Sequence, residues 1–213
     1  MNVYTYLNRH KKLLLAGSCC CFLVLFRFVI SLEYYYFFLI WNLFLAGIPF
    51  LLSEFISKTE NFMATGILGM LWLLFLPNSF YVVTDLIHLQ NSNRPYFDVF
   101  IIGSFAVLCC WLGFKSIQHM EQKFEILIPN TISWLIKIGV LFLCSFGIYL
   151  GRFLRYNSWN LLSDPYNLLE DCFSFLRFPI RHLEVWLFTI VFGLVLTGLY
   201  YIYLHLNPKN ATE

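Results

Sequence analysis

The sequence of 213 residues is poor in charged side chains. Asp, Glu, Lys and Arg together make up 12% of it, whereas a soluble globular domain carries about 25%. The formal net charge of +2 is also too small to attract DNA or RNA electrostatically. These shortages exclude a soluble enzyme, a disordered regulator and a nucleic-acid-binding protein.

Recognisable catalytic and metal-binding motifs are absent as well. The sequence has no phosphate-binding glycine loop, no HExxH helix, no Gly-x-Ser-x-Gly elbow and no haem motif. Its cysteines form no CxxC pair, and no His stands at metal-ligand spacing from any of them. Because several lie inside apolar runs, as Cys19 and Cys109 do, we interpret them as small hydrophobic packing residues. No cofactor and no metal ion are expected.

Apolar residues dominate what remains. Hydrophobic residues make up 60% of the chain, and the mean hydropathy is +0.70. A helix that crosses the hydrocarbon core needs about 20 apolar residues, and its backbone must satisfy its own hydrogen bonds. The sequence therefore predicts an all-α fold, a polytopic transmembrane helical bundle of about six spans.

The bundle is expected to be one transmembrane domain over residues 13–206. A cytoplasmic segment, 1–12, precedes it and a tail, 207–213, follows it. The predicted spans are 13–30, 34–52, 62–82, 97–114, 132–150 and 183–206, with a charged loop at 115–125. The third span meets Pro77 after about fifteen residues, where the helix must kink or stop.

Charge next to the first span predicts the orientation. Arg9, Lys11 and Lys12 directly precede this span, and positive residues mark the cytoplasmic side. We therefore expect a protein of the bacterial cytoplasmic membrane with its N-terminus inside. The loops near residue 31, at 77–98 and at 151–181 then face outward, although the last one carries four arginines, which we interpret as paired or functional. Arg27 is expected to reach the membrane interface.

One polar stripe stands out after Pro77. If residues 78–92 are helical, polar residues fall within about 80° of one another: Asn78, Tyr81, Asp85, His88 and Ser92. A carboxylate in lipid costs several kcal/mol, so this stripe should face the bundle interior or a wet cavity. Asp85 and His88, three residues apart, could form a buried structural pair, line a binding site or ion pathway, or act in catalysis with His88 as base or with both as metal ligands.

A second polar concentration follows the fifth span. If that helix continues, Arg152, Arg155 and Trp159 share one face, and Asn157 lies between them. Two guanidinium groups one turn apart form a good receptor for a phosphate or carboxylate. The structural alternatives are contact with lipid phosphates or ion pairing with Asp85, Asp98 or Asp164. Asp164-Pro165 also predicts the start of a short helix, which either lies on the membrane surface or packs on the bundle.

The predicted topology brings both concentrations to the outer face of the membrane. We therefore expect a shared ligand-binding site formed by Asn78, Tyr81, Asp85, His88, Arg152, Arg155, Asn157 and Trp159. Its predicted ligand is an anionic lipid or a small anion, which the protein would bind or move. The alternatives are a membrane-embedded enzyme that uses Asp85 and His88, and a structural subunit of a membrane complex; apart from the bilayer, the sequence identifies no partner.

Four segments resemble a known family. The runs 75–81 (FLPNSFY) and 84–89 (TDLIHL), the run 151–159 (GRFLRYNSW) and the run 41–46 (WNLFLA) are similar to signatures of bacterial integral membrane proteins that form a domain of unknown function. The resemblance extends from about residue 36 to the last span. It implies a helical membrane fold and a bacterial cytoplasmic membrane, and no established activity.

Overall fold

The fold is entirely helical over the part of the chain that the structure describes. The computed structural model describes residues 8, 10–32, 34–91, 94–125, 128–156, 158 and 163–207, with the backbone alone at 87–91. These residues contain no β-strand, and their elements are α2 (Lys11–Ser31), η1 (Tyr35–Phe37), α3 (Phe38–Lys58), α4 (Phe62–Phe75), α5 (Pro77–Tyr81), η2 (Val82–Asn91), α6 (Pro95–Phe124), α7 (Asn130–Phe153), α9 (Pro165–Arg177) and α10 (Leu183–Leu206).

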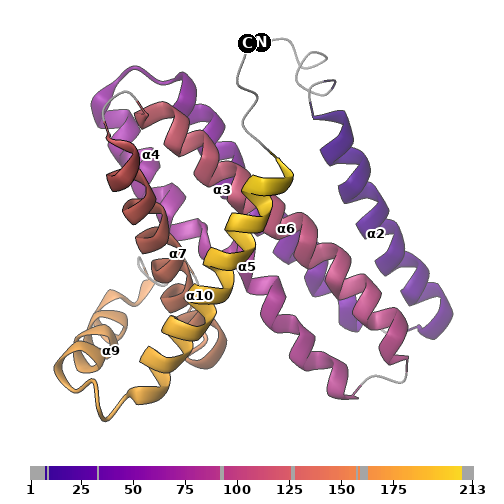
Figure 1. Ribbon diagram of the computed structural model, residues 1–213. Helices are drawn as coiled ribbons and strands as arrows, with labels where there is room; N and C mark the ends of the chain where they lie inside the picture. Colours follow the sequence, from indigo (N-terminus) through magenta and orange to yellow (C-terminus); the bar gives the residue numbers. More distant parts are fainter. Residues whose placement is uncertain are drawn as a thin grey trace.

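Within the described residues, six segments are long and apolar enough to cross a membrane. They are Lys11–Ser31, Tyr35–Lys58, Phe62–Leu86, Pro95–Phe124, Asn130–Phe153 and Leu183–Leu206. This finding confirms the predicted all-α fold of about six spans and fits a multi-pass membrane protein. The third segment joins α4, α5 and η2, and it runs the length of the bundle in spite of Pro77 (Figure 1).

The charged stretch 115–125 differs from the expected loop, because α6 continues through it to Phe124. Polar residues of this stretch are buried, and they form hydrogen bonds with side chains of other helices. Ser116 accepts a hydrogen bond from the indole nitrogen of Trp72 at 3.1 Å, and the Gln118 side-chain oxygen accepts one from the Tyr203 hydroxyl at 3.3 Å. Tertiary partners therefore extend a helix that composition alone would end at Phe114.

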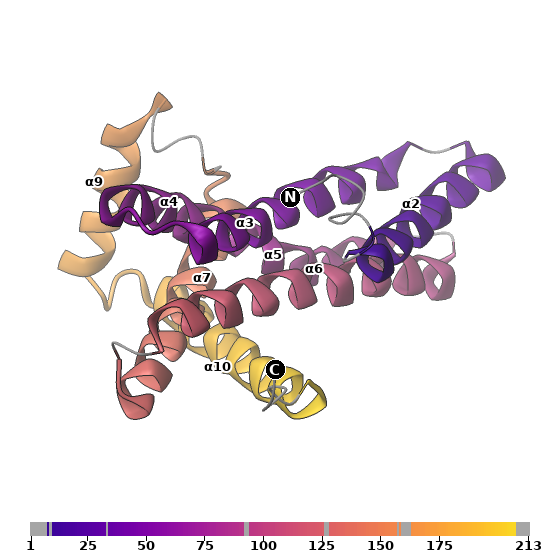
Figure 2. The ribbon, with the colours of Figure 1, turned by 90° about the horizontal axis from the view of Figure 1, so that it is seen from above.

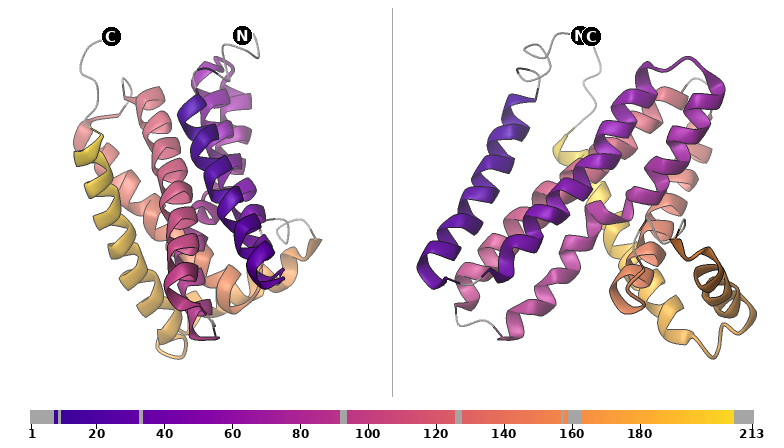
Figure 3. Two further views of the ribbon diagram at one scale, coloured as in Figure 1. Left: turned by 90° about the vertical axis from the view of Figure 1, so that its right-hand side faces the viewer. Right: turned by 180° about the vertical axis from the view of Figure 1, so that it is seen from behind.

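The spans run side by side between two ends of the bundle (Figure 3, left). The Lys11 end holds the start of α2 and the end of α10. The α9 end holds the end of η2, the start of α6 and helix α9 (Figure 1). Lysines of the described helices lie in the half nearer the Lys11 end: Lys11, Lys12, Lys58, Lys115, Lys123 and Lys137. Described arginines lie in the other half: Arg27, Arg94, Arg152, Arg155, Arg177 and Arg181.

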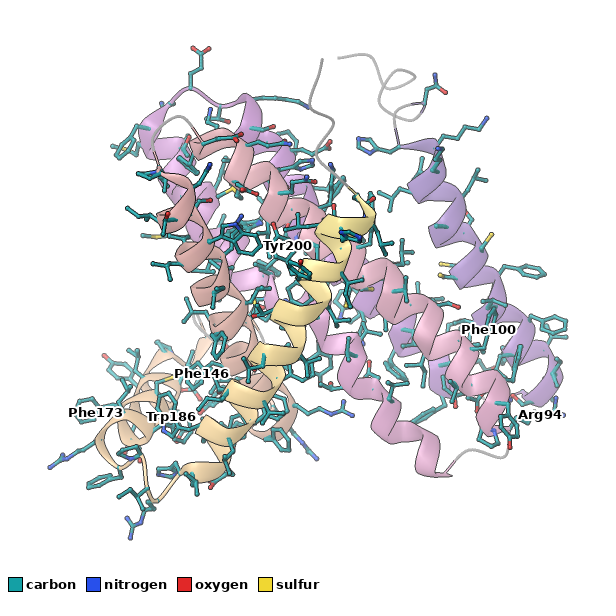
Figure 4. All side chains as sticks on the ribbon, viewed as in Figure 1. Arg94, Phe100, Phe146, Phe173, Trp186 and Tyr200 are labelled. Carbon is teal, nitrogen blue, oxygen red and sulfur yellow. The ribbon has the colours of Figure 1, made fainter. Side chains whose placement is uncertain are left out.

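Helix α6 is the centre of the bundle. In its most apolar window 56% of the residues are buried, against 17% for α2 at one side of the molecule. One apolar core joins α6 to α2 and α3, and a second joins it to α4, α5, α7 and α10. In the second core the centre of the Phe114 ring lies 5.0 Å from that of Phe80 and 5.4 Å from that of Tyr200. Figure 4 shows Tyr200 in the middle of the bundle.

Helix α9 lies at one side of the molecule, opposite α2 when seen from above (Figure 2). It begins after Asp164, as the Asp-Pro pair predicts, although the Asp164 carboxylate accepts from the Asn167 side chain at 2.8 Å and forms no hydrogen bond to the helix backbone. Phe175 is buried against α7 and α10, near the stacked rings of Phe146 and Trp186 (Figure 4). The opposite face of α9 is apolar and exposed: Tyr166, Leu169, Phe173 and Leu176.

Candidate functional site

The short helix α5 is held between α6 and α7 by two glycines. A Cβ atom at Gly113 of α6 would lie 2.7 Å from the Cβ of Ser79, and one at Gly147 of α7 would lie 2.8 Å from Cγ of Pro77. Both distances are shorter than any real Cβ contact, so only glycine permits this approach. Proline at the first position of α5 lacks the N–H that a continuous helix would need, and so it starts a new helix here.

A buried ion pair fixes the start of η2 to α7. One Arg152 terminal nitrogen, Nη1, donates to Oδ1 of Asp85 at 3.0 Å, and the Asn42 amide of α3 donates to Oδ2 at 3.1 Å. Asp85 is only 1% exposed. Because an uncompensated carboxylate is expensive in a low-dielectric interior, this pairing is what allows Asp85 to be ionised inside the bundle.

Arg152 makes three further contacts with the same segment. Its Nη2 donates to the Thr84 carbonyl at 3.2 Å, and its Nη1 lies 3.4 Å from the Tyr81 hydroxyl, which accepts. The guanidinium carbon also lies 5.6 Å from the centre of the Tyr81 ring. The guanidinium group is therefore used as a planar multi-point connector, a role for which lysine would be a poor substitute.

Asn78 connects the kink to the segment after α7. Its amide nitrogen donates to the Phe75 carbonyl at 2.9 Å and to the Ser158 hydroxyl at 3.1 Å. The Ser158 hydroxyl in turn donates to the Leu74 carbonyl at 3.2 Å. Both side chains thus bind carbonyls in the last turn of α4, where Pro77 interrupts the helical hydrogen bonds.

A cavity of about 580 Å³ lies in front of these residues. Most of its wall is apolar and comes from α3, α4 and α7, and Leu168 of α9 also lines it. The polar side chains in the wall come from α3, α5 and the segment after α7: Asn42, Asn78, Tyr81, Tyr156 and Ser158. This volume and this mixture of many apolar groups with a few polar ones are typical of small-molecule sites.

The end of α7 separates the two arginines that the sequence placed on one face. The helix ends at Phe153, and Arg155 has the left-handed backbone conformation, with φ 61°. The Tyr156 N–H then donates to the Leu150 carbonyl at 3.1 Å, and so satisfies one of the free carbonyls in the last turn of α7. Arg152 therefore points into the bundle, whereas Arg155 is exposed at the α9 end.

The structure brings four of the predicted site residues together, namely Asn78, Tyr81, Asp85 and Arg152. Asn78 and Tyr81 line the cavity, while the Asp85–Arg152 pair lies behind Tyr81. The backbone after Tyr81 is a 3-10 helix and not the expected α-helix, so the predicted stripe does not continue with α-helical spacing. The side chain of His88, as well as Ser92, Asn157 and Trp159, lies outside the described residues.

Sequence reasoning missed three polar contributors to the site: Asn42, Thr84 and Ser158. Asn42 had a usable signal, since a lone amide in the middle of an apolar span needs a partner inside the protein. Thr84 contributes through its backbone carbonyl, and a main-chain acceptor leaves no trace in the sequence.

A second buried ion pair was also missed. Arg27 of α2 donates from Nε to Oδ1 of Asp98 at 2.7 Å and from Nη2 to Oδ2 at 3.3 Å. Arg27 is 2% exposed and Asp98 is 0% exposed. The expectation that Arg27 reaches the membrane interface is therefore wrong, because a carboxylate on α6 provides a closer partner within the bundle.

Outside the spans, one hydrogen bond attaches α9 to the segment after α7. The Tyr156 hydroxyl donates to Oδ2 of Asp171 at 2.9 Å. This bond to a carboxylate raises the pKa of the Tyr156 phenol from 10.0 to about 12, because the phenolate form could not donate. Burial raises the pKa of the neighbouring Cys172 thiol, to which the Asp171 charge adds.

Comparison with known proteins gives a family and no activity. No curated protein and no solved structure matches the chain. A family model described as "Protein of unknown function (DUF1361)" matches residues 41–199, which include every part of the cavity wall and the Asp85–Arg152 pair. The family resemblance expected from the motifs is thereby confirmed, and the chain belongs to this family of proteins of unknown function.

Proposed function

We propose that this multi-pass membrane protein binds an anionic lipid in the cavity at the α9 end. The observation that supports the proposal is the cavity itself, whose apolar wall suits a hydrocarbon chain. Asn78, Tyr81 and Ser158 supply hydrogen-bonding groups within that wall for the polar part of the lipid. We propose the same orientation as the charge before the first span predicts, in the bacterial cytoplasmic membrane with the N-terminus inside.

The two arginines have different roles in this proposal. Arg152 is already neutralised by Asp85, so it positions Tyr81 and keeps the cavity wall in place. Arg155 is exposed next to Tyr156, a residue of the wall, and it provides the positive charge that selects an anionic headgroup.

The contacts of Asp85 favour binding over the catalytic alternative. Its two carboxylate oxygens accept from Arg152 and Asn42, and the residue is 1% exposed. A carboxylate that orients a catalytic base would instead have to share a water-accessible site with its substrate. We therefore develop the binding proposal alone.

Photo-crosslinking tests where the lipid lies. The protein is reconstituted in phosphatidylcholine vesicles that contain phosphatidylglycerol with a diazirine on one acyl chain, and adducts are mapped by peptide mass spectrometry. Adducts are expected on the cavity wall, at residues 70–74 and 143–150. Leu73→Trp, which fills the cavity, should remove them, whereas the control Leu194→Trp, on an exposed face of α10 outside the cavity, should not.

The headgroup preference is tested with Arg155→Ala. One arginine near an anionic surface contributes about 1 kcal/mol, so the preference for tagged phosphatidylglycerol over tagged phosphatidylcholine should fall about fivefold. Arg177→Ala removes an exposed arginine of α9 that, unlike Arg155, is not adjacent to a residue of the cavity wall, and it serves as the control. Equal adduct yields for both lipids, or displacement of the tagged lipid by inorganic phosphate, would contradict the proposal.

A further inference from the structure

A second cavity, of about 620 Å³, lies at the opposite end of the bundle from the one just described. It is lined by His10, directly before α2, and by residues in the second halves of α3 and α6. These are helices of the first core, and Figure 3 (right) shows α2 running along that side of the molecule. No residue of this cavity lines the cavity at the α9 end.

Basic side chains outnumber acidic ones in its wall. Among the described residues, Lys58, Lys115 and Lys123 line it together with one carboxylate, Glu54. The His10 ring nitrogen Nε2 lies 3.2 Å from Oε1 of Glu54. A second histidine, His119, also lines the cavity and is within hydrogen-bond distance of the Ser53 hydroxyl, 3.1 Å from Nδ1. The cavity therefore carries a net positive charge at neutral pH and attracts an anion.

An apolar groove opens from this cavity towards the middle of the bundle. It has a volume of about 660 Å³ and shares His10 and Phe50 with the charged cavity, so the two meet at these residues. Along α2 the groove extends from Leu13 to Leu25, which is about 18 Å at 1.5 Å per residue. The hydrocarbon core of a bilayer is about 30 Å thick, so the groove has roughly the depth of one leaflet.

Two glycines keep the groove open. A Cβ atom at Gly47 of α3 would contact nothing within 4 Å, and one at Gly17 of α2 would contact only the tip of Leu43, at 3.9 Å. Neither glycine is needed for close packing between helices, in contrast to Gly113 and Gly147. A larger side chain at Gly47 would therefore project into the groove without displacing another helix.

We propose that the charged cavity and the groove together bind an anionic amphiphile at the Lys11 end. Its phosphate lies among Lys58, Lys115 and Lys123, and one hydrocarbon chain occupies the groove between α2 and α3. The match of positive cavity to anionic headgroup, and of groove depth to leaflet depth, identifies a phospholipid of this leaflet as the occupant. The inference does not depend on lipid binding at the α9 end, because the two sites share no residue.

The test is photo-crosslinking of the full chain in phosphatidylcholine vesicles that contain diazirine-tagged phosphatidylglycerol. Adducts on residues 13–25 and 43–51 are expected, and these peptides are distinct from those of the other cavity. Gly47→Phe fills the groove and should abolish these adducts while leaving those of the α9 end unchanged. Gly103→Phe is the matched control, since its Cβ also contacts nothing within 4 Å and it lies outside the groove.

The headgroup site is tested with Lys58→Gln/Lys115→Gln. At about 1 kcal/mol for each lysine, the apparent affinity for phosphatidylglycerol should fall about 30-fold, equivalent to about 2 kcal/mol. Lys11→Gln/Lys12→Gln removes the same charge from two exposed lysines at the same end that do not line the cavity, and it should have little effect. Unchanged elution in gel filtration shows that each variant is folded.

Three results would overturn the inference. The first is an adduct pattern on α2 and α3 that Gly47→Phe leaves unchanged. The second is an equal loss of affinity in the two lysine double variants, which would indicate general surface attraction. The third is full displacement of the tagged lipid by inorganic phosphate, which would show that a soluble anion alone occupies the charged cavity.

Discussion

Arg27 and Asp98 form a two-point ion pair that joins α2 to α6, with nitrogen-to-oxygen distances of 2.7 and 3.3 Å. The Arg27 guanidinium also lies 5.5 Å from the centre of the Tyr36 ring. Helix α2 is the least buried of the candidate spans, so a large share of its attachment depends on this pair. The pair lies near the α9 end of α2, whereas the groove opens between α2 and α3 towards the other end.

Breaking this pair from one side should destabilise the protein strongly. Arg27→Met leaves the Asp98 carboxylate buried without its partner, and such a loss costs about 3–5 kcal/mol. The free energy of unfolding in mixed micelles of detergent and dodecyl sulfate measures the effect.

The double variant Arg27→Met/Asp98→Leu removes both charges, and we expect it to recover most of the stability. Replacement of a buried ion pair by apolar residues of similar size is often neutral or stabilising. A double variant no more stable than Arg27→Met would show that the pair is not the main attachment of α2.

Alanine at Gly113 or Gly147 should destabilise the bundle by about 1–3 kcal/mol, because an added Cβ would overlap Ser79 or the Pro77 ring. The matched controls are Gly66→Ala and Gly139→Ala, where a Cβ atom meets nothing within 4 Å. These should be neutral or up to about 1 kcal/mol more stable, since alanine favours the helix. Unfolding free energies that do not separate the two pairs would contradict the close packing of α5.

Replacement of Arg155 should separate stability from binding. Arg155→Gly relieves the left-handed conformation and should stabilise the protein by about 1 kcal/mol, while the preference for phosphatidylglycerol falls. Arg155→Ala keeps a Cβ atom in that conformation, so it should lose the same lipid preference without the gain in stability. Thermal unfolding and crosslinking yield, measured on the same preparations, distinguish the two effects.

The hydrogen bond from Tyr156 to Asp171 should make the attachment of α9 sensitive to high pH. The pKa of Tyr156 is about 12 in the folded protein and near 10.0 when the bond is absent. A raised pKa means that the bond stabilises the docked helix fully below pH about 10 and that this contribution is lost as the pH rises through about 12.

Carbon-13 chemical shifts of labelled tyrosine, assigned by comparison with Tyr156→Phe, report this titration. In Asp171→Asn the pKa of Tyr156 should return towards 10.0. Amide hydrogen exchange in α9 should be faster in Tyr156→Phe than in the wild-type protein, with exchange in α6 as the internal reference.

Side-specific labelling tests the orientation in the membrane. In a variant without the seven native cysteines, Tyr96→Cys and Ser163→Cys should react with an impermeant maleimide added to intact cells. Both positions lie at the α9 end and are exposed. Glu60→Cys, exposed at the Lys11 end, should react only after the cells are made permeable. Reaction of Glu60→Cys in intact cells would contradict this orientation and indicate the opposite one.

Much of the fold could be predicted from the sequence, because a lipid environment imposes strong local rules. A span must be long, apolar and helical, so composition and run length alone predicted an all-α bundle of about six spans. Pro77 predicted the break between α4 and α5, and Asp164-Pro165 predicted the start of α9, since proline acts through its own ring and missing N–H.

The sequence also identified the polar residues that needed partners, namely Asp85 and Arg152, without identifying the pairing uniquely. Asp85, Asp98 and Asp164 were equally eligible for the arginines, because a carboxylate far away in the chain gives no sign of its distance in space. Only the tertiary structure decided that Asp85 pairs with Arg152 and Asp98 with Arg27.

The separation of Arg152 from Arg155 was likewise a tertiary result. Both lie within one turn of an ideal helix, but α7 ends between them, because the backbone at Arg155 turns left-handed and the Tyr156 N–H bonds back to the Leu150 carbonyl. The lysine-lined cavity with its apolar groove also arises from helices distant in sequence, α2, α3 and α6. Local chemistry thus determined which segments are helices in a membrane, whereas packing between distant helices decided which charges are neutralised and which remain exposed at a cavity.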